Sequence, residues 1–254
     1  MLKLTHDNYF SQEAEAEYMS YSQFKKFEIC EEAALFAEKE EKTYYTEGHF
    51  FEALLEGNGM DFIKEHPEML TRQGELRANY KQIGESALAI HKQPVLADII
   101  DRCEKQVILT GEIAGVPFKG CIDLFDPVTL DSYDTKCVKD FRRCWSDADK
   151  QKLEWYFAYG YHYQALIYRE LIYQNFGKAG AQHLIAATKE KVPDVEFWRF
   201  STEILDDALS IINYAAPRYH DIKKGIEKPC GCGECDYCKA NKIIHEPYTI
   251  KEFK

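Results

Sequence analysis

The chain has 254 residues, of which 45% are hydrophobic and 14% aromatic, and this composition excludes disorder over most of its length. No segment reaches the roughly 18 consecutive apolar residues of a membrane-spanning helix, and the N-terminus has no apolar signal region, so we expect a cytoplasmic protein. The formal net charge of −11 opposes binding to a phosphate backbone at long range, although a nucleic-acid enzyme needs only a local basic track.

The N-terminal part of the chain shows helical patterns. Ser20-Tyr21-Ser22-Gln23 is typical of a capping box. Four residues that follow share the spacing of one helical face: Phe24, Phe27, Cys30 and Ala34. Further helices are predicted at about 45–55, 74–91 and 95–103, and Pro94 separates the last two.

Beyond residue 103 the apolar pattern changes to that of strands. Three β-rich runs, 107–113, 116–125 and 130–138, predict an antiparallel meander. They are followed by a long helix at about 146–175, strands at 184–188 and 195–200, and a helix at about 202–224. This order predicts an α/β fold of the α+β kind, with a mixed central sheet flanked by helices and an N-terminal helical extension.

We expect three parts along the chain. Residues 1–102 form the N-terminal helical part, 103–226 the α/β core, and 227–254 a cysteine-rich tail that packs on the core.

Two aspartates and a lysine stand out in the predicted meander. Alternation places Ile122 and Leu124 on one face of the second strand and Asp123 on the other; in the third strand it places Asp134 and Lys136 on one face. A hairpin can bring Asp123 beside that pair. Buried charges are costly unless they are paired or bind a metal ion. The triplet that begins at Asp134 is common by chance, so on its own a buried salt bridge or a solvated sheet face explains it better than a catalytic site.

The segment from residue 136 to 152 is locally basic. It carries six lysines and arginines against three aspartates. A solvated loop and helix face explains this charge as well as a track for DNA does.

Nine cysteines are distributed unevenly, and four of them crowd into nine residues: Cys230, Cys232, Cys235 and Cys238. A disulfide framework is typical of smaller secreted chains, so this crowding indicates metal ligands. The last three have the Cys-x₂-Cys-x₂-Cys spacing of a ferredoxin-type run, whose fourth ligand comes from elsewhere. Cys230 as the fourth ligand would instead make a local zinc knuckle, and a metal-free turn is the third interpretation.

Six motifs follow one another in a fixed order. They are Ser20-Tyr21-Ser22 leading to Cys30, Gly48-His49, Gly120-Cys121-Ile122-Asp123, Asp134-Thr135-Lys136, Gln164 with Tyr168, and the terminal cysteines. Over about residues 20 to 238 this order resembles the RecB-like branch of the PD-(D/E)XK nucleases, and the phage-type RecE-like exodeoxyribonucleases fit best. The chain departs from the pattern where Gly48 directly precedes His49 and where Glu31, not proline, follows Cys30.

The resemblance implies a metal-dependent deoxyribonuclease that hydrolyses phosphodiester bonds at double-stranded DNA ends in recombination. It implies Mg²⁺ or Mn²⁺ bound by His49, Asp123, Asp134 and the backbone carbonyl of Thr135. Lys136 would orient the attacking water or stabilise the phosphate.

The resemblance also implies that Gln164 and Tyr168 hold Lys136 or the DNA backbone. It further implies that Cys30 completes the ligand set of a [4Fe-4S] cluster, with zinc as the alternative. The three remaining ligands are in the tail: Cys232, Cys235 and Cys238. The implied partners are linear duplex DNA ends, a single-strand annealing recombinase and further copies of the chain in a homo-oligomer. No membrane is implied.

Two alternative functions stay open. A nuclease of the CRISPR-adaptation type or of the AddB repair type shares the fold and the cysteine pattern. A non-catalytic module that binds DNA or protein and has a zinc-bound tail belongs to another class. The intact Asp123, Asp134 and Lys136 argue against the second alternative, because binding alone does not need them.

Overall fold

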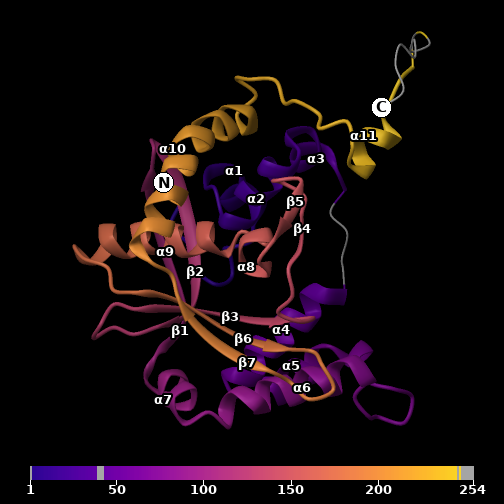
Figure 1. The fold of residues 1–254 in the computed structure, drawn as a ribbon, viewed down its shortest axis with the longest axis vertical. Coiled ribbons are helices and arrows are strands. Elements are labelled where there is room, and N and C mark those ends of the chain that lie inside the picture. The colour runs from indigo at the N-terminus through magenta and orange to yellow at the C-terminus, as the bar shows by residue number, and fades with distance from the viewer. Residues whose placement is uncertain (1, 39–42, 245, 247–254) are drawn as a thin grey trace.

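A mixed sheet of five strands, in the order β1-β2-β3-β6-β7, forms the centre of the molecule. The computed structural model describes residues 2–38, 43–244 and 246 (Figure 1). The strands are β1 (Glu104–Ile113), β2 (Val116–Phe125), β3 (Ser132–Val138), β6 (Gln182–Thr188) and β7 (Val195–Arg199). β3 and β6 run parallel, and the other neighbouring pairs run antiparallel. The predicted meander and the predicted α/β fold with a mixed sheet are confirmed.

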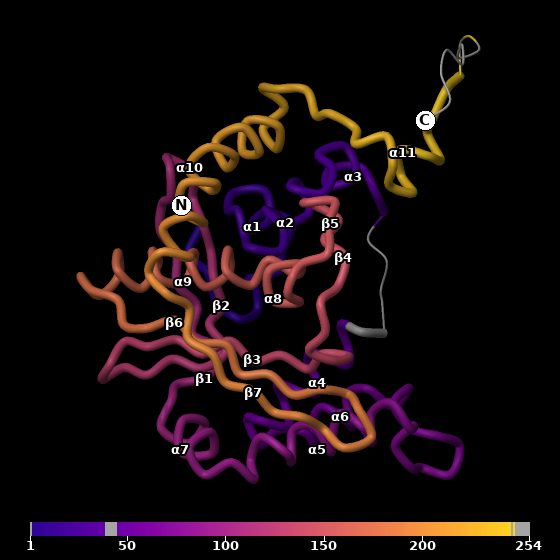
Figure 2. Tube along the Cα trace, viewed as in Figure 1, coloured from indigo at the N-terminus to yellow at the C-terminus, as the bar shows by residue number. Residues whose placement is uncertain are grey.

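Helices cover both faces of this sheet, as the trace in Figure 2 shows. One core contains side chains of α2 (Tyr21–Ile29), α9 (Tyr161–Phe176) and α10 (Thr202–Lys223). The other contains side chains of α4 (Thr43–Leu55), α6 (Ala78–His91) and α7 (Pro94–Arg102). The shorter helices are α1 (Gln12–Glu17), α3 (Glu31–Phe36), α5 (Gly59–Glu65), η1 (Pro67–Met69), α8 (Trp155–Ala158) and α11 (Asp236–Ala240). No helix within the described ranges is long and apolar enough to cross a membrane.

The first predicted helix is interrupted at Cys30. Its capping box is present, with Ser20 and Gln23 exchanging hydrogen bonds. The helix nevertheless ends at Ile29, because Cys30 has an extended backbone with φ −166° and ψ 116°, and α3 begins at the next residue. The expectation of one helical face running on to Ala34 is therefore wrong, and Cys30 lies at a corner between two helices.

The long helix predicted at 146–175 is also wrong in its first half. That stretch forms a hairpin of β4 (Cys144–Ser146) and β5 (Gln151–Leu153), followed by α8. Lys150 in the hairpin has φ 55° and Gly160 before α9 has φ 76°, and both conformations interrupt a right-handed helix. The helix predicted from residue 74 begins only at Ala78, after a turn in which Gly74 has φ 81°.

Side-chain alternation along β2 breaks at Asp123. Ile122 packs in the core that includes α9, whereas Leu124 packs in the core that includes α6, so the prediction that they share one face is wrong. The pairing of β1 with β2 skips the position opposite Asp123, where Gln106 has φ 52°. This local distortion of the ladder changes which side chains of β2 face each core.

β2 and β3 diverge at the same point. They pair only at Leu124 with Tyr133 and at Phe125 with Ser132. Beyond these two pairs the backbone groups of β2 and β3 that face each other need other partners. The split opens the sheet between the strands that carry the predicted aspartates.

Candidate active site

Asp123 bridges the gap between the diverging strands β2 and β3. Its Oδ2 accepts hydrogen bonds from the backbone N–H of Thr135 at 2.8 Å and from the Thr135 hydroxyl at 3.1 Å. The carboxylate thus accepts the hydrogen bond of a β3 backbone N–H that has no backbone partner on β2 after the two strands diverge. Asp123 is 8% exposed, so it is held in a largely water-free position.

Lys136 brings the two predicted aspartates together. Its Nζ lies 2.7 Å from Oδ1 of Asp134 and 3.8 Å from Oδ2 of Asp123. The same ammonium donates to the backbone carbonyl of Thr135 at 3.2 Å, so this predicted metal ligand contacts Lys136 here. It also lies 5.3 Å from the ring centre of Tyr161. Three charged side chains from two strands therefore converge on one point.

A chain of hydrogen bonds from α9 holds Asp134. The Gln164 side-chain amide donates to Oδ1 of Asp134 at 2.7 Å and to the Tyr168 hydroxyl at 2.8 Å. The Tyr168 hydroxyl donates in turn to the backbone carbonyl of Cys121 on β2 at 2.6 Å. Gln164 and Tyr168 thus fix Asp134 and the split end of β2. Gln164 reaches Lys136 through their shared partner, Oδ1 of Asp134, and the implied contact with the DNA backbone stays a prediction.

Gly120 makes room for that chain. A Cβ atom at this position would lie 2.9 Å from Cε1 of Tyr168 and 3.0 Å from Cδ1 of Leu171. Tyr168 can therefore reach the β2 backbone only because residue 120 has no side chain. The glycine of the Gly-x-x-Asp motif and the tyrosine of the Gln-x-x-x-Tyr motif form one packing contact.

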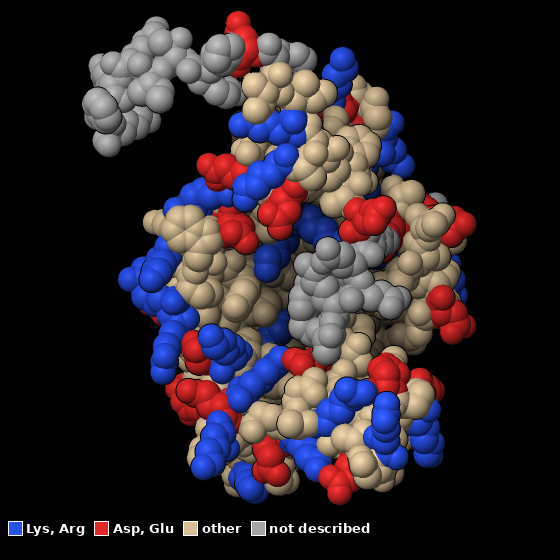
Figure 3. Space-filling model, turned by 90° about the vertical axis from the view of Figure 1, so that its right-hand side faces the viewer, with Lys and Arg blue, Asp and Glu red and all other residues tan. Residues whose placement is uncertain are grey.

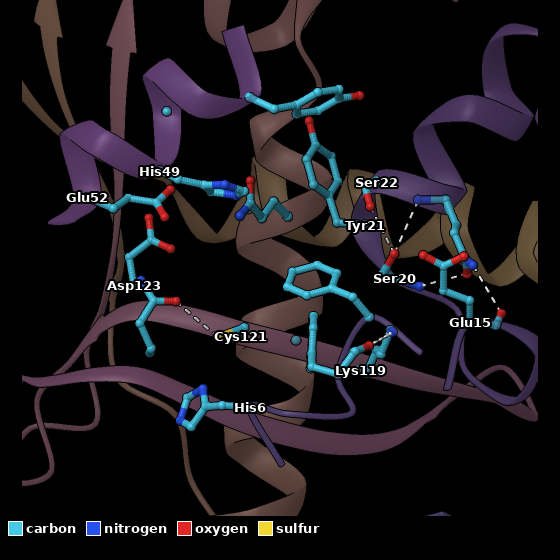
Figure 4. A pocket seen from close by; sticks show the side chains of 18 of the residues that line it. His6, Glu15, Ser20, Tyr21, Ser22, His49, Glu52, Lys119, Cys121 and Asp123 are labelled. Carbon is cyan, nitrogen blue, oxygen red and sulfur yellow. Dashed lines mark hydrogen bonds between the residues drawn. The ribbon is translucent and has the colours of Figure 1, made fainter. Parts of the chain in front are cut away.

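Glu52 is a site residue that the sequence reasoning missed. It lies on α4 three residues after His49, and Figure 4 shows its carboxyl group facing that of Asp123, with the His49 ring beside it. Its spacing of i and i+3 from His49 was the available signal, because such residues share a helix face. His49 itself lies at the solvent-exposed rim.

Burial is the main cause of the raised pKa values of two acids at this point. Burial, reinforced by the Asp123 charge, raises the pKa of Glu52 to about 8. Burial also raises the pKa of Asp134 to about 7, although the Lys136 ammonium acts in the opposite direction. Loss of water on the cleft side lowers the pKa of His49, which favours its neutral, metal-binding form.

The donors suit a hard divalent cation by their chemistry, although among the described residues only four cysteines, described below, have ligand atoms that all lie within 4.8 Å of one another. Glu52, Asp123 and Asp134 offer carboxylate oxygens, the ligands that Mg²⁺ and Mn²⁺ prefer. Among the described residues, Oδ2 of Asp134 and Oε1 of Gln164 are buried and have no hydrogen-bond partner. Buried oxygens without partners are rare and call for an explanation such as a bound ion or water. A cation at this point would also neutralise the carboxylates whose pKa values are raised.

These groups lie at the side of a large open cleft. The cleft has a volume of about 1130 Å³ and is lined by residues of α1, α2, α4, β2 and α9. Asp123, Lys136 and Gln164 are part of its lining, and Lys26, Lys119 and Lys223 line it further along. Figure 3 shows lysine and arginine side chains beside and inside the hollow on one face, with acidic side chains around them. The negative net charge thus coexists with local positive charge.

The basic segment after β3 is partly neutralised within the molecule. Arg143 lies 3.5 Å from Glu154, and Lys150 lies 3.3 Å from Glu234 of the tail. These two cations therefore contribute less to a DNA track than their number in the sequence indicates.

Four cysteines from distant parts of the chain meet at the corner between α2 and α3. The sulfur atoms of Cys30, Cys232, Cys235 and Cys238 all lie within 4.8 Å of one another, and this group could hold a metal ion or cluster. Cys230 is outside the group. It is exposed, and its backbone N–H binds Glu31 at 2.7 Å. The local knuckle with Cys230 as fourth ligand is thus not the arrangement that forms.

Comparison with known proteins agrees with this architecture. The model of the PDDEXK-like domain of unknown function, DUF3799, matches residues 20–241. A crystal structure from Eubacterium rectale, of a protein named as a candidate exonuclease, is 30% identical, with a TM-score of 0.85 over 98% of this chain and 97% of that chain. The crystal structure of SSO0001 is 14% identical with a TM-score of 0.31 over 85% of this chain and 92% of that chain, too low to support an argument. No curated protein matches the chain. The chain belongs to the PDDEXK-like DUF3799 family.

Proposed function

We propose that this protein is a metal-dependent deoxyribonuclease, and within that class a RecE-like exonuclease that acts on the ends of double-stranded DNA in recombination. One observation carries the proposal: Asp123, Asp134 and Lys136 converge within hydrogen-bonding or ion-pair distance at the edge of an open cleft. A module that only binds DNA needs positive charge in its cleft and has no use for buried carboxylates, which repel phosphate.

The residues divide the work of hydrolysis among them. Glu52, Asp123 and Asp134, with His49 at the rim, would hold Mg²⁺ or Mn²⁺. A bound divalent ion polarises the scissile phosphate and lowers the pKa of the attacking water. Lys136 places a positive charge at the site, where it can stabilise the charge that develops on the phosphate.

The residues behind these groups fix their positions. Gln164 holds Asp134 from α9, and Thr135 holds Asp123 from β3. Both contacts are inside the protein, so the two carboxylates keep their orientation without help from the substrate. Such preorganisation reduces the reorganisation needed during the reaction.

The open form of the cleft supports a polymeric substrate. Its lining runs from the carboxylates on β2 to Lys26 on α2 and Lys223 on α10, which lie in different parts of the fold. Lys223 donates to the Tyr18 carbonyl and to the Gln23 side chain, so Lys26 and the open length of the groove are the features that suit a repeating phosphate backbone. A single-strand annealing recombinase and further copies of the chain in a homo-oligomer are the partners that a RecE-like role implies.

The same core would serve a nuclease of the CRISPR-adaptation or AddB type. The likeness to one candidate exonuclease over nearly the whole of both chains favours the exonuclease role. The alternative from another class, a non-catalytic binding module with a zinc-bound tail, is disfavoured by the intact group of carboxylates and lysine.

Cleavage of end-labelled linear duplex and of closed circular DNA tests the proposal. With Mg²⁺, the protein should shorten the linear duplex from its ends and leave the circle intact. Asp134→Ala and Lys136→Ala should each lower the rate by about 10³-fold or more, because each removes several kcal/mol of transition-state stabilisation. Circular dichroism checks that both variants fold.

Asp101→Ala is the matched control, because Asp101 is an exposed carboxylate at the end of α7. It should cleave at the wild-type rate. Near-normal cleavage by either site variant would refute the assignment of the site. Equal cleavage of the circle would refute the exonuclease role while leaving nuclease activity intact.

A further inference from the structure

The spacing of the four cysteine sulfurs carries chemical information. All four sulfur atoms lie within 4.8 Å of one another, and the sulfurs of Cys30 and Cys238 are 3.6 Å apart. A disulfide bond is about 2.05 Å long, so no pair is oxidised. Four thiolates around one shared cation are the arrangement of a structural metal site.

The two kinds of centre that take four thiolates need different spacings. A zinc ion has zinc–sulfur distances of about 2.3 Å, so the sulfurs of its tetrahedron are about 3.8 Å apart. In a [4Fe-4S] cluster each thiolate binds a different iron at a corner of the cube, which spreads the sulfurs to about 6 Å. The separations here, none above 4.8 Å, fit one ion and are too short for the cube.

We propose that Cys30, Cys232, Cys235 and Cys238 bind a single tetrahedral metal ion, zinc, and not the iron–sulfur cluster that the resemblance implies. The site is built from both ends of the chain.

Backbone N–H groups donate hydrogen bonds to three of the four sulfurs. The N–H of Cys232 donates to the Cys30 sulfur at 3.4 Å, and the N–H of Cys235 donates to the Cys232 sulfur at 3.3 Å. The N–H of Cys238 donates to the Cys235 sulfur at 3.5 Å. Such contacts orient metal-binding thiolates and reduce their charge repulsion. They link each ligand of the tail to the next.

The corner at Cys30 explains why the first ligand can reach the tail. Because its backbone is extended between α2 and α3, the side chain is turned out of the helix face that packs on the core. Next to it, Glu31 binds Arg218 of α10 through two bonds of 2.8 Å and also holds the N–H of Cys230. The last of these contacts joins the start of the tail to α3 directly.

The ion would connect the cysteine-rich tail to α2, which borders the cleft. α2 ends at Ile29, directly before Cys30, and its first turn, including Tyr21 and Ser22, lines the cleft. Glu234, between two of the ligands, pairs with Lys150 of the β4–β5 hairpin. The role that follows is structural: the ion joins the tail to α2 and to the hairpin.

Metal analysis of the intact chain purified without oxygen tests the proposal, with both iron and zinc supplied during expression. We expect one zinc per chain, no acid-labile sulfide and a colourless protein. Zinc-edge X-ray absorption should show four sulfur neighbours at about 2.3 Å. Cobalt exchanged into the site should give the visible bands of a tetrahedral thiolate centre.

Two cysteine variants separate the proposed ligands from their neighbour. Cys30→Ser should lose zinc on dialysis and melt at a lower temperature, and Cys238→Ser, in the peripheral tail, should do the same if the first variant folds poorly. Cys230→Ser is the matched control and should keep one zinc per chain.

Three results would overturn the proposal, and none depends on nuclease activity. They are brown protein with four irons and four sulfides per chain, zinc that stays bound in Cys30→Ser and Cys238→Ser, and metal-free protein whose melting temperature is unchanged by added zinc or by a chelator.

Discussion

Replacing Gly120 by alanine should destabilise the fold and impair cleavage together. The new Cβ would lie 2.9 Å from Cε1 and 3.1 Å from Cδ1 of Tyr168, and 3.0 Å from Cδ1 of Leu171. Real Cβ atoms do not approach carbon this closely, and both neighbours are buried side chains of α9. Overpacking of this kind costs about 1–3 kcal/mol, so urea denaturation should show a loss of that size in the free energy of unfolding.

The displaced helix should also move the site. Tyr168 and Gln164 are joined by a hydrogen bond, and Gln164 holds Asp134, so a shift of the tyrosine reaches the carboxylate through one intermediate. A misplacement of about 1 Å can lower a rate by about 10²-fold. Single-turnover cleavage with saturating Mg²⁺ should therefore be slower by about 10- to 100-fold, with substrate binding affected less.

Gly84→Ala supplies the matched control. Gly84 lies within α6, and a Cβ there would meet no atom within 4 Å. Because alanine is favoured over glycine inside a helix, this variant should gain about 0.5–1 kcal/mol and cleave normally. Wild-type stability and rate in Gly120→Ala would refute the packing argument.

Two further predictions concern the same site. Tyr168→Phe removes the hydroxyl that pairs with Gln164 and with the Cys121 carbonyl. It should lower the free energy of unfolding, measured by urea denaturation, by about 1–3 kcal/mol and should slow cleavage. An unchanged unfolding midpoint would contradict the hydrogen-bond chain. The pKa values of Glu52, about 8, and Asp134, about 7, lie above the values of about 4 for unfolded chains, so the folded protein binds the extra protons. Without metal, the melting temperature should therefore fall as pH rises from about 4 to 8, and added Mg²⁺ should restore it most at the upper end, because the ion replaces those protons. Glu52→Gln should flatten this dependence, and a metal-free protein that becomes more stable over the same range would contradict it.

The sheet and its polar residues could be predicted because strand patterns are local. The turns at 114–115 and 126–127 and the alternation in β3 were enough to place Asp134 and Lys136 on one side, and these two side chains are in contact. The switch of faces at Asp123 could not be predicted, since it depends on the conformation of Gln106 in the neighbouring strand.

Other features could not be predicted from the sequence because they depend on contacts between distant parts of the chain. An acid such as Glu52 is ordinary in a helix, and only its approach to Asp123 makes it unusual. Residues 144–153 include enough helix-forming residues to be predicted as the start of the long helix. They form a hairpin instead, and the buried Trp155 follows it in the sequence. The hydrogen-bond partner of Gln164 could not be predicted either. Its spacing to Tyr168 shows that the two share a helix face, but not which strand residue lies opposite that face.

The four-cysteine group has a consequence for the unfolded chain. Cys30 and Cys232 are 202 residues apart, so a metal ion that joins them closes a loop containing most of the sequence. By analogy with a disulfide, a closure of that length removes conformational entropy worth about 5 kcal/mol at 25 °C from any unfolded state that keeps the ion. The centre can also form only after the last ligand has been synthesised. A nascent chain would therefore complete this group late, after both Cys30 and the cysteines of the tail have been made.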